Sequence, residues 1–327
     1  MNLYTQPPLQ RRLLFCPGEP APLDEIRRIC YDGCIFFRVV RSMKKDALMI
    51  AVSMLIFGTV GAFKRFIPVS AGELALYRAV LATVVIGLVL LLLKRPIPFG
   101  KIKKQLPLLF ISGAAMGINW ILLFKAYEYT TVSAATLSYY FAPVIVTLLC
   151  PVFFKEKMTP KQILCFVVST LGLVLITGLE GGAGDHLTGI LFGLSAAVFY
   201  ASVVLFNKFI QGVDGLHRTL LQFIAAIIVL APYVALTGGT SLGAMPTSGW
   251  INLLIVGIVH TGLCYCLYFS ALRTVSGQKA AILSYIDPLV AVLVSVTFLQ
   301  EPMGLTQWIG GAMILGATLY NEIGPRK

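Results

Sequence analysis

Long apolar segments recur along this chain, and only short polar gaps separate them. Ten windows are long and apolar enough to cross the ~30 Å hydrocarbon core of a bilayer as helices. They lie at about 46–64, 71–93, 106–127, 131–153, 162–179, 188–206, 218–237, 250–271, 277–299 and 304–321. The pattern predicts an all-α polytopic membrane protein with ten transmembrane helices.

Composition and charge also favour a membrane protein. Of the 327 residues, 57% are apolar and 12% are charged, about half the ~25% charged fraction of soluble domains. The net charge of +12 comes from basic residues scattered through the gaps, so no basic face is expected for nucleic acid. With both termini in the cytoplasm, nearly all Lys and Arg of the gaps lie on the cytoplasmic side, as the positive-inside rule requires. We therefore expect that topology, contact with membrane lipid and no nucleic-acid partner.

Residues 1–42 differ from the rest of the chain. They contain prolines and charges, and their one apolar patch, residues 34–40, is too short to span a bilayer. Met43 is followed by two lysines and then at once by the first apolar window. We expect residues 1–42 to be a non-spanning extension, with translation in vivo starting at or near Met43.

The two halves of the chain are related by an internal repeat. A shift of 145 residues aligns Tyr140-Phe141-Ala142-Pro143 with Tyr285-Ile286-Asp287-Pro288, and gives twelve ungapped identities between residues 117 and 162. Each half, 43–180 and 186–323, contains five apolar windows. Because five is odd, the second half must enter the bilayer from the opposite side. The sequence thus predicts two inverted five-helix repeats, an arrangement that favours alternating access.

Two tyrosines and two prolines at matched repeat positions are candidate substrate ligands. Tyr140 and Tyr285 each stand three residues before a proline, Pro143 or Pro288. A proline within a span frees a backbone carbonyl, which is tolerated facing protein or a hydrated cavity. The pairs would then line the substrate cavity. The alternative is that both tyrosines pack against neighbouring helices and the prolines only shape the bundle.

Aromatic and amide groups near the middle of two further windows suit an amphipathic ligand. Asn119 and Trp120 lie in the third window, and Tyr265 occupies the repeat position of Trp120 in the eighth. Aromatic rings supply apolar contact area and an amide orients a polar end. Packing is the alternative role for Trp120.

Asp287 and His260 are candidates for coupling, with a proton as the coupling ion. Asp287 is the one carboxylate deep within an apolar window. It could carry a proton or bind a substrate amine; the alternative is a buried pair with Lys279 or with a residue on another helix. His260, midway along the eighth window, could serve a proton relay or be a hydrogen-bonded structural residue.

Three more charged residues are candidates for coupling or gating. Arg78 could attract an anionic group, although reaching the membrane surface or pairing with Glu73 or Glu128 is the favoured alternative. Glu156 and Glu301 mark matched helix ends. Each is expected to form local hydrogen bonds at a loop, or a gate contact that alternates between states.

The sequence contains no motif for metal, nucleotide or covalent chemistry. Gly181-Gly182-Ala183-Gly184 lacks the Lys-Ser/Thr of a nucleotide-binding loop, and neither a zinc-spaced cluster nor a nucleophile elbow is present. We therefore expect no catalytic residue, no metal and no cofactor.

Several residues together resemble the EamA-type branch of the drug/metabolite transporter superfamily. They are Ile56-Phe57-Gly58-Thr59, Arg78 within Leu74–Ala79, Ala126, and the two segments that run from a proline to Glu156 and Glu301. The resemblance covers about 46–322. It implies ten helices, residence in the bacterial inner membrane, a central cavity, and export or exchange of small metabolites such as amino acids. Phe57 stands where the family often has tryptophan, and the second half shows Gln222 near the position of Arg78.

The leading interpretation is a secondary active transporter that exports a small amphipathic metabolite. Two alternatives stay open, a membrane-embedded receptor and a lipid-modifying enzyme. The enzyme would need a nucleophile or metal cluster at a membrane interface, and the receptor would bind a ligand without flux. The oligomeric state is left open by the sequence.

Overall fold

The computed structural model describes residues 45–322 apart from short gaps at 98, 155–157, 178–183, 239–240, 273 and 276. The extension 1–42, the start at Met43 and the candidate Glu156 lie outside the described residues. Within the described part the regular structure is entirely helical. The prediction of an all-α chain is confirmed for these residues.

The helices follow one another with short connections. In chain order they are α2 (Lys45–Gly58), α3 (Val60–Arg65), α4 (Ala71–Leu92), α5 (Phe99–Ile102), η1 (Lys103–Gln105), α6 (Leu106–Tyr129), α7 (Val132–Tyr139), α8 (Ala142–Phe154), α9 (Pro160–Thr177), α10 (Gly184–Phe209), α11 (Gly215–Leu236), η2 (Leu242–Ala244), α12 (Thr247–Leu254), η3 (Ile255–Leu263), α13 (Cys264–Ala271), α14 (Gly277–Ser284), α15 (Ile286–Thr297) and α16 (Leu305–Glu322). The segments η1 and η2 are 3₁₀-helices, whereas η3 is a π-helix. Helical residues lie over each of the ten apolar windows.

Seven helical segments of the described chain are long and apolar enough to cross a membrane. They are Lys45–Arg65, Ala71–Leu92, Lys103–Tyr129, Val132–Leu149, Asp185–Phe209, Gly215–Leu236 and Thr247–Ala271. Two shorter apolar helices cover Pro160–Ile176 and Ile282–Thr297. The ninth window is shortened by a break at Tyr285, and α16 contains polar residues such as Gln307. The chain is therefore a multi-pass membrane protein in which seven of the ten expected spans meet these criteria.

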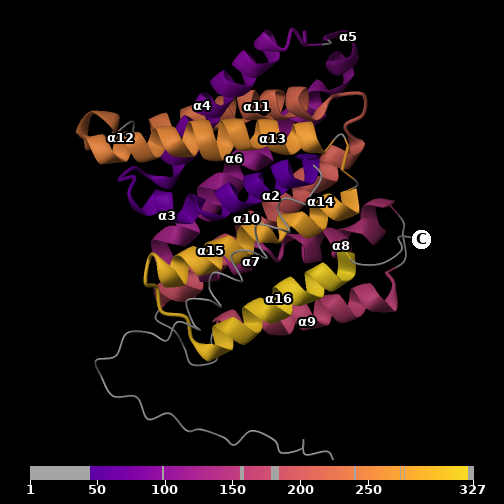
Figure 1. Ribbon diagram of the computed structural model, residues 1–327, viewed down its shortest axis with the longest axis vertical. Helices are drawn as coiled ribbons and strands as arrows, with labels where there is room; N and C mark the ends of the chain where they lie inside the picture. Colours follow the sequence, from indigo (N-terminus) through magenta and orange to yellow (C-terminus); the bar gives the residue numbers. More distant parts are fainter. Residues whose placement is uncertain are drawn as a thin grey trace, which may run out of the picture. The chain divides into compact units, whose positions relative to one another are not determined.

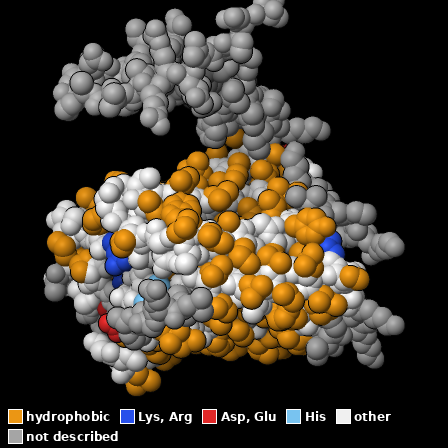
Figure 2. All heavy atoms as spheres, turned by 90° about the horizontal axis from the view of Figure 1, so that it is seen from below, with side chains coloured by type: hydrophobic (Ala, Val, Ile, Leu, Met, Phe, Trp, Pro, Cys, Tyr) orange, Lys and Arg blue, Asp and Glu red, His pale blue; other side chains and the backbone are white. Residues whose placement is uncertain are grey.

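Large apolar side chains cover the outside of the bundle. Figure 1 shows α9 and α16 side by side at one edge, away from α4 and α11. Their exposed side chains include Leu164, Leu171, Trp308 and Ile309. Figure 2 looks at this edge and shows mostly apolar atoms, with Lys and Arg toward its two ends. An apolar face of this size is a liability in water and is expected in contact with lipid.

Helices of the two halves approach each other closely at glycines. A Cβ atom on Gly113 of α6 would lie 2.3 Å from the carbonyl oxygen of Gln222 in α11. A Cβ atom on Gly262 of η3 would lie 2.7 Å from the Cβ of Val85 in α4. Lipid gives helices no hydrophobic reason to associate, so transmembrane packing depends on such close van der Waals contact at small residues. The positions of α4, α6, α11 and η3 relative to one another follow from these contacts.

Gly113→Val is expected to lower the thermal stability of the purified protein in detergent. The added side chain meets backbone that cannot move aside, and overpacking of this kind costs about 1–3 kcal/mol. The matched control is Gly87→Val, because a Cβ atom on Gly87 of α4 meets nothing within 4 Å. Thermal unfolding followed by size-exclusion chromatography measures both variants. Equal melting temperatures for the two variants would show that the α6–α11 approach is not tight.

Candidate functional site

A buried arginine lies at the meeting point of α4, α6 and η3. The side chain of Arg78 is within an apolar span, and the residue is only 5% exposed. Its Nε atom donates a hydrogen bond to Oγ1 of Thr261 at 3.1 Å. The guanidinium carbon lies 4.4 Å from the centre of the Trp120 ring and 5.2 Å from that of Phe124. Cation–π contact with two rings therefore surrounds this charge.

The carboxylates expected to pair with Arg78 have other partners. Glu73 accepts hydrogen bonds from the backbone N–H groups of Ser70 and Ser241, at 3.1 and 2.6 Å. Glu128 pairs with two lysines, Lys64 at 3.2 Å and Lys125 at 3.3 Å. The expected pairing of Arg78 with Glu73 or Glu128 is wrong, as is the expectation that its side chain reaches the surface. Among the residues that the structure describes, no carboxylate forms an ion pair with Arg78.

The π-helix η3 carries two polar residues into the centre of the bundle. Within it, Thr261 donates to the carbonyl of Val256 at 2.8 Å, and Nδ1 of His260 lies 3.3 Å from that of Ile255. The other ring nitrogen of His260, Nε2, lies 2.8 Å from Oγ1 of Thr59, at the break between α2 and α3. His260 thus has a polar partner at each ring nitrogen. This fits the alternative that His260 is a hydrogen-bonded structural residue and not part of a proton relay. Short π-helical insertions are rare and often occur at functional sites.

Aromatic rings from both halves meet beside Arg78. The ring of Phe223 lies 5.2 Å from that of Trp120 and 5.2 Å from that of Tyr265, in edge-to-face geometry. Tyr265 also contacts Phe57 at 5.2 Å. The predicted residues Trp120 and Tyr265 are therefore brought together through Phe223, which the sequence analysis missed. The internal repeat could have identified Phe223, because it stands 145 residues after Arg78 and so occupies the matching position in the second half.

Tyr140 and Asp287 form a direct hydrogen bond between the two halves. The Tyr140 hydroxyl donates to Oδ2 of Asp287 at 2.5 Å. Tyr140 caps the end of α7, and the buried Tyr285 occupies the matching break before α15. Pro143 and Pro288 lie in the first turns of α8 and α15, where a missing N–H removes no helical hydrogen bond. The prolines thus begin new helices instead of bending continuous ones.

Asn119 and Lys279 are the remaining residues considered in the sequence analysis. Asn119 donates from Nδ2 to the carbonyl of Ala196 at 2.7 Å, so its amide holds α6 against α10. The side chain of Lys279, considered as a partner of Asp287, lies outside the described residues.

Tyr139 connects the surroundings of Arg78 with those of Asp287. It packs against the apolar cluster that contains Trp120, and its ring lies 5.9 Å from that of Tyr140, which donates to Asp287. Within the described part of the chain, Arg78 and Asp287 form no ion pair with each other. One aromatic region inside the bundle therefore contains a cation and a carboxylate that do not neutralise each other by direct contact.

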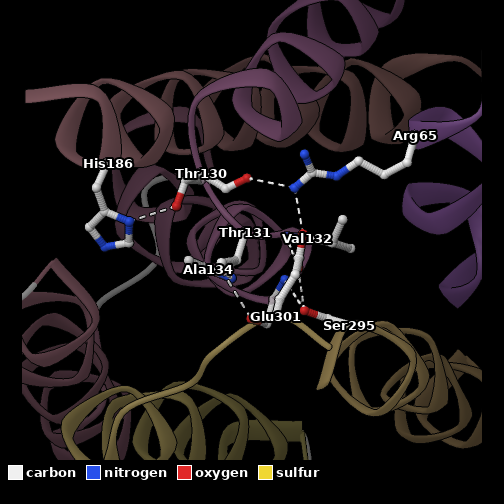
Figure 3. A network of polar contacts seen from close by, with 9 residues as sticks. Arg65, Thr130, Thr131, Val132, Ala134, His186, Ser295 and Glu301 are labelled. Atoms are coloured by element: carbon white, nitrogen blue, oxygen red, sulfur yellow. Dashed lines mark hydrogen bonds and ion pairs between the residues drawn. The ribbon is translucent and has the colours of Figure 1, made fainter. Parts of the chain in front are cut away.

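A second polar cluster lies at the end of the bundle where α3 ends and α7 begins (Figure 3). Oε2 of Glu301 accepts hydrogen bonds from the backbone N–H of Val132 at 2.7 Å and from the Ser295 hydroxyl at 2.5 Å. Arg65 donates to Oε1 of Glu301 at 2.5 Å and to the carbonyl of Thr130 at 3.3 Å. One carboxylate therefore joins the end of α3, the start of α7 and the turn after α15. We call these contacts the Glu301 network.

An open cavity of about 620 Å³ adjoins the Glu301 network. It is lined by Arg65, Glu128, Tyr129, Thr130, Thr131, His186, Leu299 and Glu301. All of these lining residues except Leu299 carry a polar group, in contrast to the aromatic surroundings of Arg78. Arg65 and His186 were not predicted, because their contacts join segments far apart in the sequence and follow no local motif. Among the described residues, no group of three or more His, Cys, Asp or Glu is placed to hold a metal ion.

Comparisons with known proteins support the resemblance found in the sequence. The chain is 31% identical over 280 residues to an uncharacterized transporter of Bacillus subtilis, YxxF, covering 84% of this chain and 89% of that protein. It is 25% identical to human solute carrier family 35 member G1, covering 78% of this chain and 72% of that protein. A solved crystal structure shares the fold, with a TM-score of 0.59 at 17% identity over 85% of this chain and 98% of that one.

The family model itself matches twice. The EamA-like transporter family model covers residues 44–178 and again residues 187–321. Together the two matches span most of the chain, with one copy in each half. The chain belongs to the EamA-like transporter family.

Proposed function

We propose that this protein is a secondary active transporter that exports a small amphipathic metabolite, an amino acid or a related compound. Family membership and the transporter relatives support the transport class. The observation that carries the proposal is the hydrogen bond from Tyr140 to Asp287. It joins the two halves at two helix breaks inside apolar spans, and discontinuous helices are where secondary transporters commonly bind substrate and coupling ion.

The proposed architecture is ten crossings in two inverted five-helix repeats, in the inner membrane with both termini in the cytoplasm. Helix bounds support it, because α14 repeats α7 and α16 repeats α9 with a shift of 145 residues. Contacts between the halves recur too. Gly117 packs against Leu230 and Gly262 packs against Val85, and these are two contacts between the same repeat positions. Reciprocal contacts of this kind are what a two-fold relation between halves produces.

The proposed substrate site is the region between the two halves. Trp120, Tyr265 and Phe223 supply its aromatic wall, and Tyr140 with Asp287 supplies a polar side. Tyr285, Pro143 and Pro288 shape the helix breaks, and Asn119 holds the wall through α10. Asp287 is the group we propose to carry a coupling proton, because it is a carboxylate inside a short apolar helix, where ionisable groups commonly serve proton relays.

The Glu301 network is the proposed outer gate. With both termini inside, α3 would end and α7 would begin at the outer face, and we propose that the network holds the helices together there. Opening there requires Glu301 to release Val132 or Arg65. Glu156, at the matching repeat position, would take the same part at the inner face.

Tyr140→Phe and Asp287→Asn are expected to reduce substrate flux. Loss of a hydrogen bond to a charged group corresponds to about tenfold or more in rate. Efflux of radiolabelled amino acids from proteoliposomes measures the effect, with Tyr320→Phe as the matched control because Tyr320 is exposed on α16. Saturable flux in the wild type, with both site variants indistinguishable from Tyr320→Phe, would refute the assignment of this site.

Glu301→Gln is expected to open the outer end more often. The variant loses the ion pair with Arg65, so the start of α7 should become accessible to water. The readout is the rate at which a membrane-impermeant maleimide labels Ser133→Cys, introduced into a protein with its native cysteines replaced. Ser133 is buried at that end, and we expect labelling to be severalfold faster. Glu128→Gln is the control, since Glu128 pairs with Lys64 and Lys125 at the same end and forms no hydrogen bond or ion pair with Glu301 among the described residues. Equal rates in the two variants would count against the gate.

A further inference from the structure

We infer that Arg78 binds the carboxylate of the substrate, so that the transported compounds are small carboxylic acids with an apolar body. The inference rests on the proposed transport function and names the chemical class that the central region accepts. It treats Arg78 as a ligand-binding residue and assigns the aromatic rings beside it to the apolar part of the same ligand.

Most N–H donors of Arg78 have no hydrogen-bond acceptor among the described residues. The guanidinium has five N–H donors, and only the one on Nε has a protein acceptor among the described residues, Oγ1 of Thr261. Both Nη atoms therefore have donors without a described protein acceptor, although the residue is 95% buried. A guanidinium edge whose two Nη atoms lack an acceptor in the described part of the chain matches the two oxygens of a carboxylate, which it can bind in a bidentate manner.

The surroundings hold this guanidinium in place before any ligand binds. Thr261 fixes Nε, and its own hydroxyl is bonded to the carbonyl of Val256 within the π-helix. Trp120 and Phe124 contact the guanidinium with their rings. A charge that is already desolvated and oriented loses little freedom when a ligand arrives, which favours binding.

The internal repeat gives independent support, because the position of Arg78 in the first half is occupied by an apolar residue in the second half. Phe223 occupies the repeat position of Arg78, and both residues contact the ring of Trp120. Apolar side chains in both places would serve helix packing better than a charge in one of them. The two halves therefore place a charged group, Arg78, and an apolar ring, Phe223, beside the same tryptophan. A molecule with a carboxylate and an apolar body has a partner for each of its parts here.

The first test compares matched ligands on the wild-type protein. The probes are the apolar amino acids phenylalanine and leucine, their carboxamides, and 3-phenylpropionic acid with its amide. Ligand-induced thermal stabilisation of the protein in lipid nanodiscs measures binding, and competition in proteoliposome counterflow measures transport. We expect each acid to act at concentrations about tenfold or more below its amide. Equal potency of acids and amides overturns the inference, and this comparison needs no variant to fold.

The second test changes Arg78 itself. We expect Arg78→Gln to raise the KM for the acids by about tenfold or more and to abolish their advantage over the amides, with Arg78→Lys intermediate because it keeps the charge without the fork. Lys125→Gln, which removes a half-buried cation paired with Glu128 near the end of α6, is the control. Folding is checked by size-exclusion chromatography. An Arg78→Gln protein that transports the acids with the wild-type KM overturns the inference.

The outcomes separate this inference from the proposed function. Saturable flux without preference for acids overturns only the role of Arg78. Specific binding of acids without any flux supports that role and overturns transport. A folded wild type that neither binds nor moves any of the acids overturns both.

Discussion

The close approach of helix backbones at glycines is the constraint on which the rest of the structure depends. Gly113 leaves no room for a methyl group against α11, and Gly262 leaves none against α4. Because lipid does not drive helices together, these contacts set how near the halves come. They place Arg78 of α4 and Phe223 of α11 beside Trp120 of α6. The glycines, which have no side chain, thus decide which residues of the two halves meet in the central region.

Helix α15 connects the central region to the Glu301 network. Asp287 lies in its first turn, and Ser295, near its end, donates to Glu301. A helix of 12 residues is about 18 Å long. One helix therefore contacts both the central region and the Glu301 network. Gly58 of α2 packs against the backbone of Asp287, which ties the start of α15 to the first half. In the proposed mechanism, a change at Asp287 reaches the outer end through displacement of α15.

The sequence predicted the helices well because apolar periodicity is a local property. It did not predict the partners of polar residues, which depend on packing between distant segments. Glu73 is drawn away from Arg78 by the N–H groups of Ser70 and Ser241, and Ser241 is far from Glu73 in the chain. The π-helix η3 was also missed, since an apolar window looks the same whether its hydrogen bonds span four residues or five. Phe223 could have been found, because the repeat relates it to Arg78.

Reporter fusions test the relation between the two halves most directly. One reporter is fused after Lys327, and another is inserted between α9 and α10, with alkaline phosphatase active outside the cytoplasm and green fluorescent protein fluorescent inside it. Two inverted five-helix repeats predict a cytoplasmic C-terminus and an external α9–α10 connection. Reporters that place both positions in the same compartment would contradict the inversion and the two-fold site between the halves.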